Sequence, residues 1–245
     1  MERERLFKSG IMRTIRVLGA AAVMMAAAMG QQAAAQATLP FEAAAPQWTK
    51  VVVAPEAGAT MYQKAVASSP TLVFDFFNAD EYEPTTYLPS WSNTVSRAHA
   101  EPRPLKGAAP VLAEKAGWVE VDYVPEVEHK GYSYKVWVPA KSVTVSAIAA
   151  LPAEADGLRL FSDGALAGYG LYRRNAEGDN ALYFGRVSGN MLVCPYVLES
   201  DAAPAALSAE EVVALLPAAK PVASGQAMVV YVPEGGAVTS QWWVK

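Results

Sequence analysis

The sequence predicts a mostly β protein in which a small β-barrel is followed by a second small β-rich domain with one short helix. Short runs of β-branched and aromatic residues recur along the chain, for example at 71–77 and 118–124. Gly, Pro, Asn and Ser clusters separate these runs at short intervals, which is typical of small barrels and sandwiches. One stretch, 208–217, carries both a start and a stop signal for a helix.

Residues 1–37 have the three parts of a secretory signal peptide. A basic segment precedes the apolar run 17–29, and a small-x-small triplet ends at Ala37. The apolar run has 13 residues, fewer than the roughly 20 that span a bilayer, so a cleaved leader is favoured over a membrane anchor. We expect an exported protein, periplasmic or secreted, that is cleaved after Ala37. Met12 is an alternative start, because a complete leader also follows it.

The mature chain is acidic. The whole sequence has 20 Lys and Arg and 24 Asp and Glu, of which the leader holds five and two. The remaining 208 residues therefore carry 15 basic and 22 acidic side chains, a net charge of −7. Because no stretch concentrates Lys or Arg, nucleic acid is excluded as an expected partner. The single cysteine, Cys194, excludes an internal disulfide framework, so folding depends on core burial.

Residues 38–147 are predicted to form the barrel domain. Strands are expected at 48–55, 60–66, 71–77, 118–124 and in the return segment 132–147. In the 118–124 run, Trp118, Glu120 and Asp122 alternate with Val119 and Val121, which indicates a half-buried strand. Residues 78–107 contain four prolines without clear periodicity and are predicted to be a long irregular insertion.

Residues 148–245 are predicted to form the second β-rich domain, with 148–157 as the boundary. Its expected strands are 168–174, 180–187, 190–198, 227–232 and 237–245. The helix is placed near 208–216, because Ser208 and Glu211 have the spacing of a capping box and Pro217 ends the segment.

Three segments of the first region occur in the order of a known family. Residues 59–73, "ATMYQKAVASSPTLV", place a Ser/Pro turn between two apolar strands; 109–124 place a tight turn before Gly-Trp; and 134–143, "YKVWVPAKSV", close with Trp-Val. Over about residues 51–145 the chain resembles bacterial SH3-like (SH3b) domains. The matching positions are Met61, Tyr62, Lys64, Pro70, Leu72, Trp118, Val121, Trp137, Val138 and Val143. The resemblance implies a five- or six-stranded barrel that binds cell-wall peptides or glycans, or packs against a neighbouring domain, without catalysis of its own.

The sequence contains few residues in the patterns that catalysis requires. His99 and His129, the two histidines, lack the spacing of a zinc site, and each is better explained as a solvated loop residue than as a general base. Cys194 lies in an apolar run and has no histidine after it that could activate it. We expect no catalytic residues, no metal and no cofactor. A cell-wall hydrolase remains a remote alternative.

The aromatic residues of the first region are the candidate ligand-binding residues. Trp118 or Trp137 is expected to be buried by barrel packing, and other aromatics can line a groove for an extended peptide. The candidate residues are Tyr62, Tyr82, Tyr87, Trp91, Tyr132, Tyr134, Asp80 and Glu81. Two functions stay open: recognition of a cell-wall peptide or glycan or of an extended protein segment, and a structural role in which the barrel packs on the second domain in an envelope assembly. For the acidic residues, a solvated loop is an equal alternative.

Overall fold

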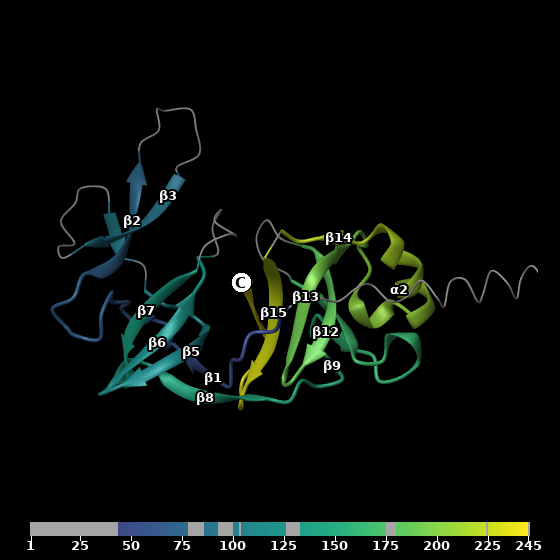
Figure 1. Ribbon diagram of the computed structural model, residues 1–245, viewed down its shortest axis with the longest axis horizontal. Helices are drawn as coiled ribbons and strands as arrows, with labels where there is room; N and C mark the ends of the chain where they lie inside the picture. The colour runs from purple at the N-terminus through teal and green to yellow at the C-terminus, as the bar shows by residue number, and fades with distance from the viewer. Residues whose placement is uncertain are drawn as a thin grey trace, which may run out of the picture.

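The computed structural model describes residues 44–77, 86–92, 100–102, 104–125, 133–174, 180–223 and 225–244, and only the backbone at 74–77, 86–92 and 100–102. Over these residues the fold is mostly β, as the sequence predicts, with one short α-helix. Strands β1 and β5–β8 lie at one end of the molecule and β9–β13 with α2 at the other, with β15 between them (Figure 1). The predicted leader, 1–37, lies outside the described residues.

The N-terminal part is a five-stranded antiparallel sheet. Its strands are β1 (Lys50–Val53), β5 (Ala108–Lys115), β6 (Trp118–Tyr123), β7 (Tyr134–Pro139) and β8 (Thr144–Ala149), in the order β7-β6-β5-β1-β8. A 3-10 turn, η1 (Ala140–Ser142), connects β7 to β8. Val119 and Val121 of β6 and Val136 and Val138 of β7 point into one core, which Met61 completes. The alternation predicted for 118–124 is thus confirmed for its valines.

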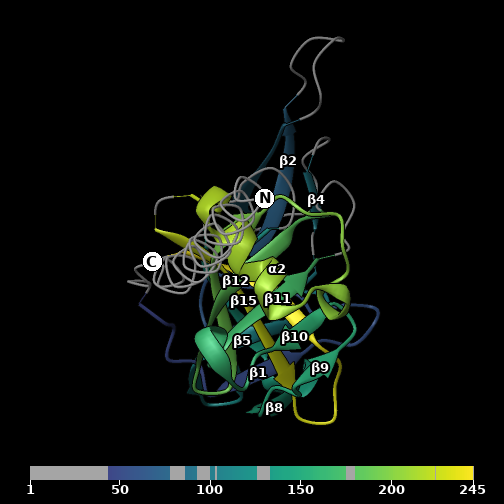
Figure 2. The same ribbon diagram turned by 90° about the vertical axis from the view of Figure 1, so that its right-hand side faces the viewer.

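The connection between β1 and β5 differs from the sequence prediction. Residues 60–66 do not form a strand: Tyr62 makes isolated bridges to Thr71 and Trp137, and the chain then turns at 63–69. The predicted irregular insertion contains β3 (Thr86–Ser92) and β4 (Ala100–Pro102), which flank β2 (Thr71–Phe77) in a three-stranded antiparallel sheet. The β2 strand and its neighbours project away from the rest of the N-terminal part (Figure 1, Figure 2).

The C-terminal part is a rolled antiparallel sheet. Its strands are β9 (Glu154–Ala155), β10 (Leu158–Leu160), β11 (Tyr169–Arg173), β12 (Leu182–Ser188), β13 (Met191–Leu198), β14 (Lys220–Pro221), β15 (Gln226–Pro233) and β16 (Thr239–Val244). Neighbouring strands of this sheet follow the order β9-β10-β11-β12-β13-β15, and β16 pairs with β15. The roll brings β16 against β11 and β12, where the Tyr172 hydroxyl donates to Ser240 Oγ at 3.1 Å and the Trp242 ring meets Tyr183 edge to face.

The helix α2 (Ala209–Leu215) begins as the sequence predicts. Ser208 Oγ accepts the Glu211 backbone N–H, and the Glu211 carboxylate accepts the Ser208 N–H, so both halves of the capping box are present. Short 3-10 turns, η2 (Gly164–Leu166), η3 (Pro204–Ala206) and η4 (Leu216–Ala218), surround it. Val212 packs α2 onto the sheet through a cluster with Leu171, Leu182 and Phe184.

The two parts share a buried hydrophobic cluster, which we call the shared core. It draws residues from both ends of the chain: Trp48, Val51, Ile148, Met191, Val193, Ala227, Val229 and Tyr231. The end of β8 pairs with the end of β15, where Ala149 faces Val232. The predicted boundary 148–157 therefore contributes Ile148 to the shared core and Glu154–Ala155 to β9.

None of the helices in the described residues is long and apolar enough to cross a membrane.

Candidate functional site

Three aromatic side chains lie side by side on the outer face of the β6–β7 sheet. Tyr62 and Trp137 are direct partners in an isolated antiparallel bridge, so their side chains leave the sheet on the same face. Trp118 stands opposite Pro139, two residues from Trp137, and therefore shares that face. The rings of Tyr62 and Trp118 meet edge to face, with centroids 5.1 Å apart and planes at 85°. We call Tyr62, Trp118, Trp137 and Pro139 the aromatic face.

The opposite side of the same strands holds the aromatic face in place. Met61, next to Tyr62, is fully buried, and so are Val136 and Val138 on either side of Trp137. The Tyr62 and Trp137 backbones exchange two hydrogen bonds of 2.8 Å each. Each aromatic ring of the face is half-buried, which leaves part of its surface to solvent while its backbone is fixed by core strands.

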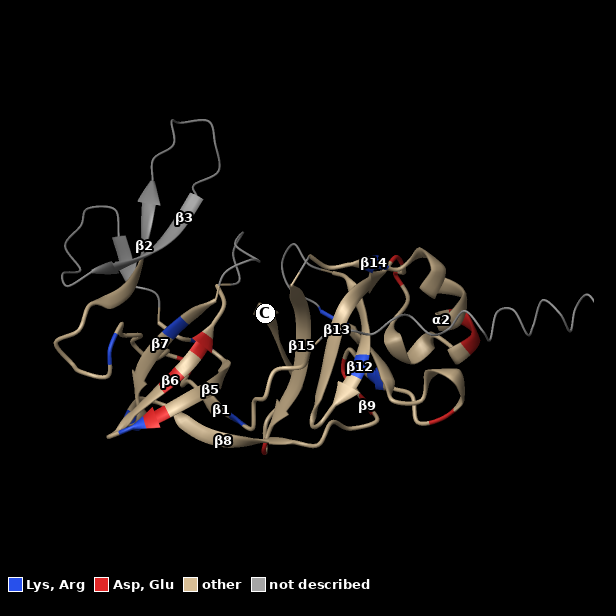
Figure 3. Ribbon diagram, in the orientation of Figure 1, with Lys and Arg blue, Asp and Glu red and all other residues tan. Residues whose placement is uncertain are grey.

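Two carboxylates from β6 adjoin the aromatic face. Glu120 pairs with Trp137, and Asp122 pairs with Lys135 of β7, so acidic residues of β6 lie beside a basic residue of β7 (Figure 3). Asp122 is only 7% exposed. Burial raises the pKa of the Asp122 carboxyl above its ordinary value, although a hydrogen bond from Ser133 and the charge of Lys135 act in the opposite direction.

Replacement of Asp122 by asparagine is expected to stabilise the protein at pH 7. Because the pKa is raised in the folded state, the carboxyl contributes stability only at acid pH, and this contribution is lost as pH rises through the folded pKa. An asparagine at 122 can still accept the Ser133 hydrogen bond and carries no charge to desolvate. Urea unfolding at pH 3 to 8 should show the difference between Asp122→Asn and wild type growing with pH. A variant less stable than wild type at pH 7 would mean that attraction to Lys135 outweighs burial.

The structure brings together only some of the predicted ligand-binding residues. Tyr62 belongs to the aromatic face, whereas Tyr134 shares the strand face of Val136 and packs against the core. Tyr87 and Trp91 lie in β3, paired with Phe76 and Leu72 of β2. The remaining four, Asp80, Glu81, Tyr82 and Tyr132, lie outside the described residues.

The expectation that barrel packing buries Trp118 or Trp137 was wrong, because neither is buried in the structure. Both are half-buried on the outer face. The valines that alternate with them along β6 and β7 fill the core, so the tryptophans lie on the opposite face of the pleated sheet. The alternation of "WVEV" and "KVWV" contains this information: in each run the valines occupy every second position and the tryptophans the positions between. The same alternation places Glu120 beside Trp118, as predicted, and Pro139 beside Trp137.

The other groups considered for catalysis or metal binding are Cys194 and the two histidines. Cys194 is fully buried in β13, and burial raises the pKa of its thiol well above the ordinary value, which keeps it protonated and unreactive. His99 and His129 lie outside the described residues. Among the residues that are described, no three His, Cys, Asp or Glu side chains are grouped to hold a metal.

Family models, curated proteins and solved structures offer no match to this chain.

Proposed function

We propose that this protein is an exported, non-catalytic binding protein whose N-terminal part is an SH3-like module. Its ligand is an extended peptide-containing segment, with the peptide or glycan of the cell wall as the first candidate and an extended protein segment as the second. The aromatic face carries this proposal. The leader-like residues 1–37 support export to the periplasm or the exterior.

The strand order supports an SH3-like module. Five antiparallel strands run in the order β7-β6-β5-β1-β8, the first and last strands of the chain segment lie side by side, and a 3-10 turn precedes the last strand. The motif residues Tyr62, Trp118 and Trp137 all meet on one outer face of this sheet. Residues that are far apart in the sequence and brought together on a solvent-facing surface point to recognition more than to packing.

The chemistry of the face favours a peptide with proline or aliphatic groups and a cation. Partly exposed Tyr and Trp rings bind proline and aliphatic groups over their flat surfaces, and extended segments are recognised in this way by other aromatic-lined surfaces. A cationic side chain is attracted to the faces of the rings and to Glu120, which pairs with Trp137. Cell-wall peptides combine an extended backbone with free amino groups, so they fit both requirements.

Co-sedimentation with purified peptidoglycan tests the proposal. The double variant Tyr62→Ala, Trp137→Ala is expected to weaken binding by about 2 kcal/mol or more, roughly 30-fold, because central aromatic residues dominate binding at such surfaces. Val145→Ala is the matched control, since Val145 is 38% exposed on β8, at the other end of the strand order. It is expected to bind like wild type.

Two results would count against the proposal. If the double variant keeps its fold, judged by near-UV circular dichroism and thermal melting, and still binds like wild type, the aromatic face is not the site. If wild type is not retained by peptidoglycan, the cell-wall ligand is wrong, and a titration with a proline-rich lysine-containing peptide decides whether the extended protein segment replaces it.

The shared core favours a second candidate, a structural component of an envelope assembly in which the N-terminal part packs on the C-terminal part. Val51 and Ile148 from one part are buried with Val193 and Val229 from the other, and Gln241 Nε2 donates to the Asp122 backbone oxygen at 2.9 Å. Limited proteolysis separates the candidates: a structural unit resists cutting near 150–157, whereas rapid cutting there into two stable halves argues against it.

A further inference from the structure

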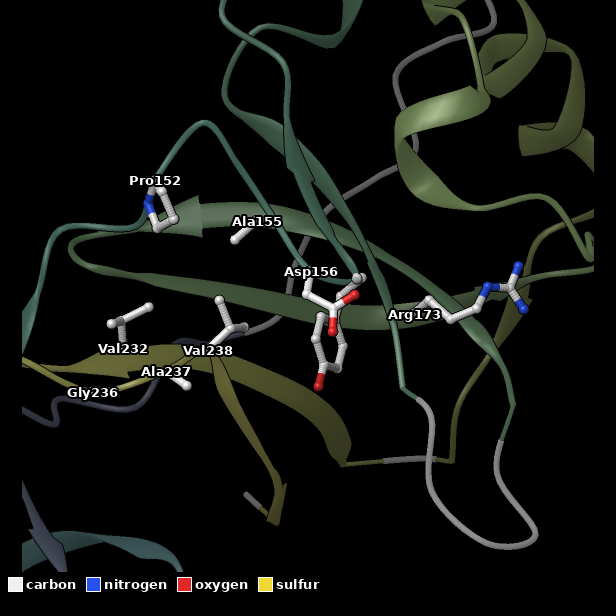
Figure 4. A pocket seen from close by; sticks show the side chains of 10 residues that line it. Pro152, Ala155, Asp156, Arg173, Val232, Gly236, Ala237 and Val238 are labelled. Atoms are coloured by element: carbon white, nitrogen blue, oxygen red, sulfur yellow. The ribbon is translucent and has the colours of Figure 1, made fainter.

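A cleft in the C-terminal part, next to the end of β15 that pairs with β8, has the size of a small-molecule site. It has a volume of about 480 Å³, within the range of about 300 to 1,000 Å³ that is common for such sites. Its walls come from the segment 152–157, from β11 and from the connection between β15 and β16 (Figure 4). None of the residues of the aromatic face lines it, so it is a separate feature of the molecule.

The walls of the cleft are fixed by backbone contacts. Gly157 adopts a positive φ of 71°, and a Cβ added there would stand 2.7 Å from the Arg173 backbone oxygen, so only glycine permits this approach. The Arg173 N–H donates to the Gly157 oxygen at 2.7 Å. Tyr172 is tied to Ser240 by the hydroxyl hydrogen bond that joins β11 to β16. The cleft is therefore formed before any ligand arrives.

One wall is apolar and the other carries a single carboxylate. Val232, Ala237 and Val238 line the β15–β16 side, and Asp156 projects its carboxylate between them and β11 (Figure 4). The Arg173 side chain points away from Asp156 in the same view. Its guanidinium donates instead to the backbone oxygens of Ser200 and Ala202 and to Asn180. The charge that faces the cleft is thus negative.

We propose that this cleft binds a small organic cation, an alkylammonium group whose charge pairs with Asp156 and whose carbon chain lies on Val232 and Val238. The Tyr172 hydroxyl oxygen, which lines the cleft and donates its own hydrogen to Ser240, provides a further acceptor for the ammonium hydrogens. The proposal does not depend on the aromatic face: each site can fail while the other stands.

Titration of the purified protein with n-pentylammonium chloride, followed by amide NMR, tests this assignment. Saturable shifts are expected at Gly157 and Val238, with a Kd of about 1 mM, a weak value that suits so small a ligand. Asp156→Asn is expected to raise the Kd about fivefold or more, because the charge-assisted hydrogen bond is lost. Asp163→Asn, which removes an exposed carboxylate from outside the cleft, is the matched control and should bind like wild type.

Neutral 1-pentanol separates charge recognition from apolar burial. It is expected to bind at least fivefold more weakly than n-pentylammonium to wild type, and with the same Kd to wild type and Asp156→Asn. Equal affinity for pentanol and pentylammonium overturns the role of Asp156, and the absence of saturable shifts at the cleft with n-pentylammonium overturns the site itself.

Discussion

Replacement of Gly185 by alanine is expected to destabilise the protein by at least about 3 kcal/mol. Gly185 lies in the middle of β12, and a Cβ added there would stand 2.0 Å from the Val193 backbone oxygen and 2.5 Å from the Cys194 Cα. Both obstacles are backbone atoms of β13, which cannot rotate away as the end of a side chain can. Relief requires β12 and β13 to separate where each also pairs with a further strand.

A bulge between β12 and β13 explains this close approach. The register shifts between Phe184 and Arg186, so that Cys194 and Pro195 of β13 stand opposite the single residue Gly185. The extra residue disrupts the ladder locally and bends β13, as bulges do, and the β13 backbone lies where a side chain at 185 would stand. On its other side Gly185 pairs with Gly170 of β11, which is also crowded, with Leu160 Cδ2 at 2.7 Å from an added Cβ. Two glycines therefore allow three strands to pass closely.

Gly189→Ala is the matched control for Gly185→Ala. Gly189 lies in the turn between the same two strands, has no neighbour within 4 Å of an added Cβ, and has a φ of 57°. Its replacement is expected to cost only about 1 kcal/mol, from the positive φ alone. Urea unfolding of both variants measures the contrast. Equal small losses would mean that β12 and β13 can move apart at the bulge without cost.

Local patterns predicted the helix and most of the strands, but they also predicted a strand at 60–66 that does not form and missed β3 and β4. The alternation of Val119 and Val121 with Trp118 and Glu120 predicts β6 as a half-buried strand, although not which of its faces is buried, and the spacing of Ser208 and Glu211 predicts the start of α2. Each signal depends on residues within one element, where the period of side-chain direction is fixed by the backbone. The fold class follows from the recurrence of such runs.

The features that local patterns did not predict depend on pairing between segments that are distant in the sequence. Residues 60–66 have a strand-like pattern, yet Tyr62 bonds to Trp137 and Thr71 in single bridges, because its partners belong to two different strands. The bulge at Gly185 depends on which residues of β13 stand opposite it. Of the aromatic face only Tyr62 was predicted as a binding residue, because the common face with Trp118 and Trp137 appears only when β7 is placed between Tyr62 and β6.

The shared core is the clearest case of long-range pairing. Val51 and Tyr231 are separated by most of the mature chain, and the sequence around each reads as an ordinary buried strand. No local pattern predicts that β1 and β15 pack on one another. Residues 148–157, interpreted as a boundary, contain Ala, Pro and Gly, a composition that is also compatible with a short crossing between two parts that share a core.

Replacement of Tyr231 by alanine is the prediction that tests the shared core. Tyr231 is fully buried, its ring meets Trp48 edge to face at 6.3 Å, and its hydroxyl donates to the Ala108 backbone oxygen of the other part at 3.3 Å. Loss of the ring leaves a cavity between the two parts and is expected to cost about 3 to 5 kcal/mol in the free energy of unfolding. Urea unfolding followed by tryptophan fluorescence measures this loss.

Tyr231→Phe distinguishes the contribution of the ring to stability from that of the hydroxyl. At pH 7 the variant is expected to lose only about 1 kcal/mol, because the ring still fills the core and one hydrogen bond is removed. Burial raises the pKa of the Tyr231 hydroxyl far above its ordinary value of 10, so above pH 10 the unfolded chain releases this proton while the folded protein keeps it. Wild-type stability therefore falls with rising pH above 10 more steeply than that of Tyr231→Phe, and the gap between the two proteins narrows. If Tyr231→Ala is no less stable than Tyr231→Phe, the ring does not hold the two parts together, and the structural role loses its main support.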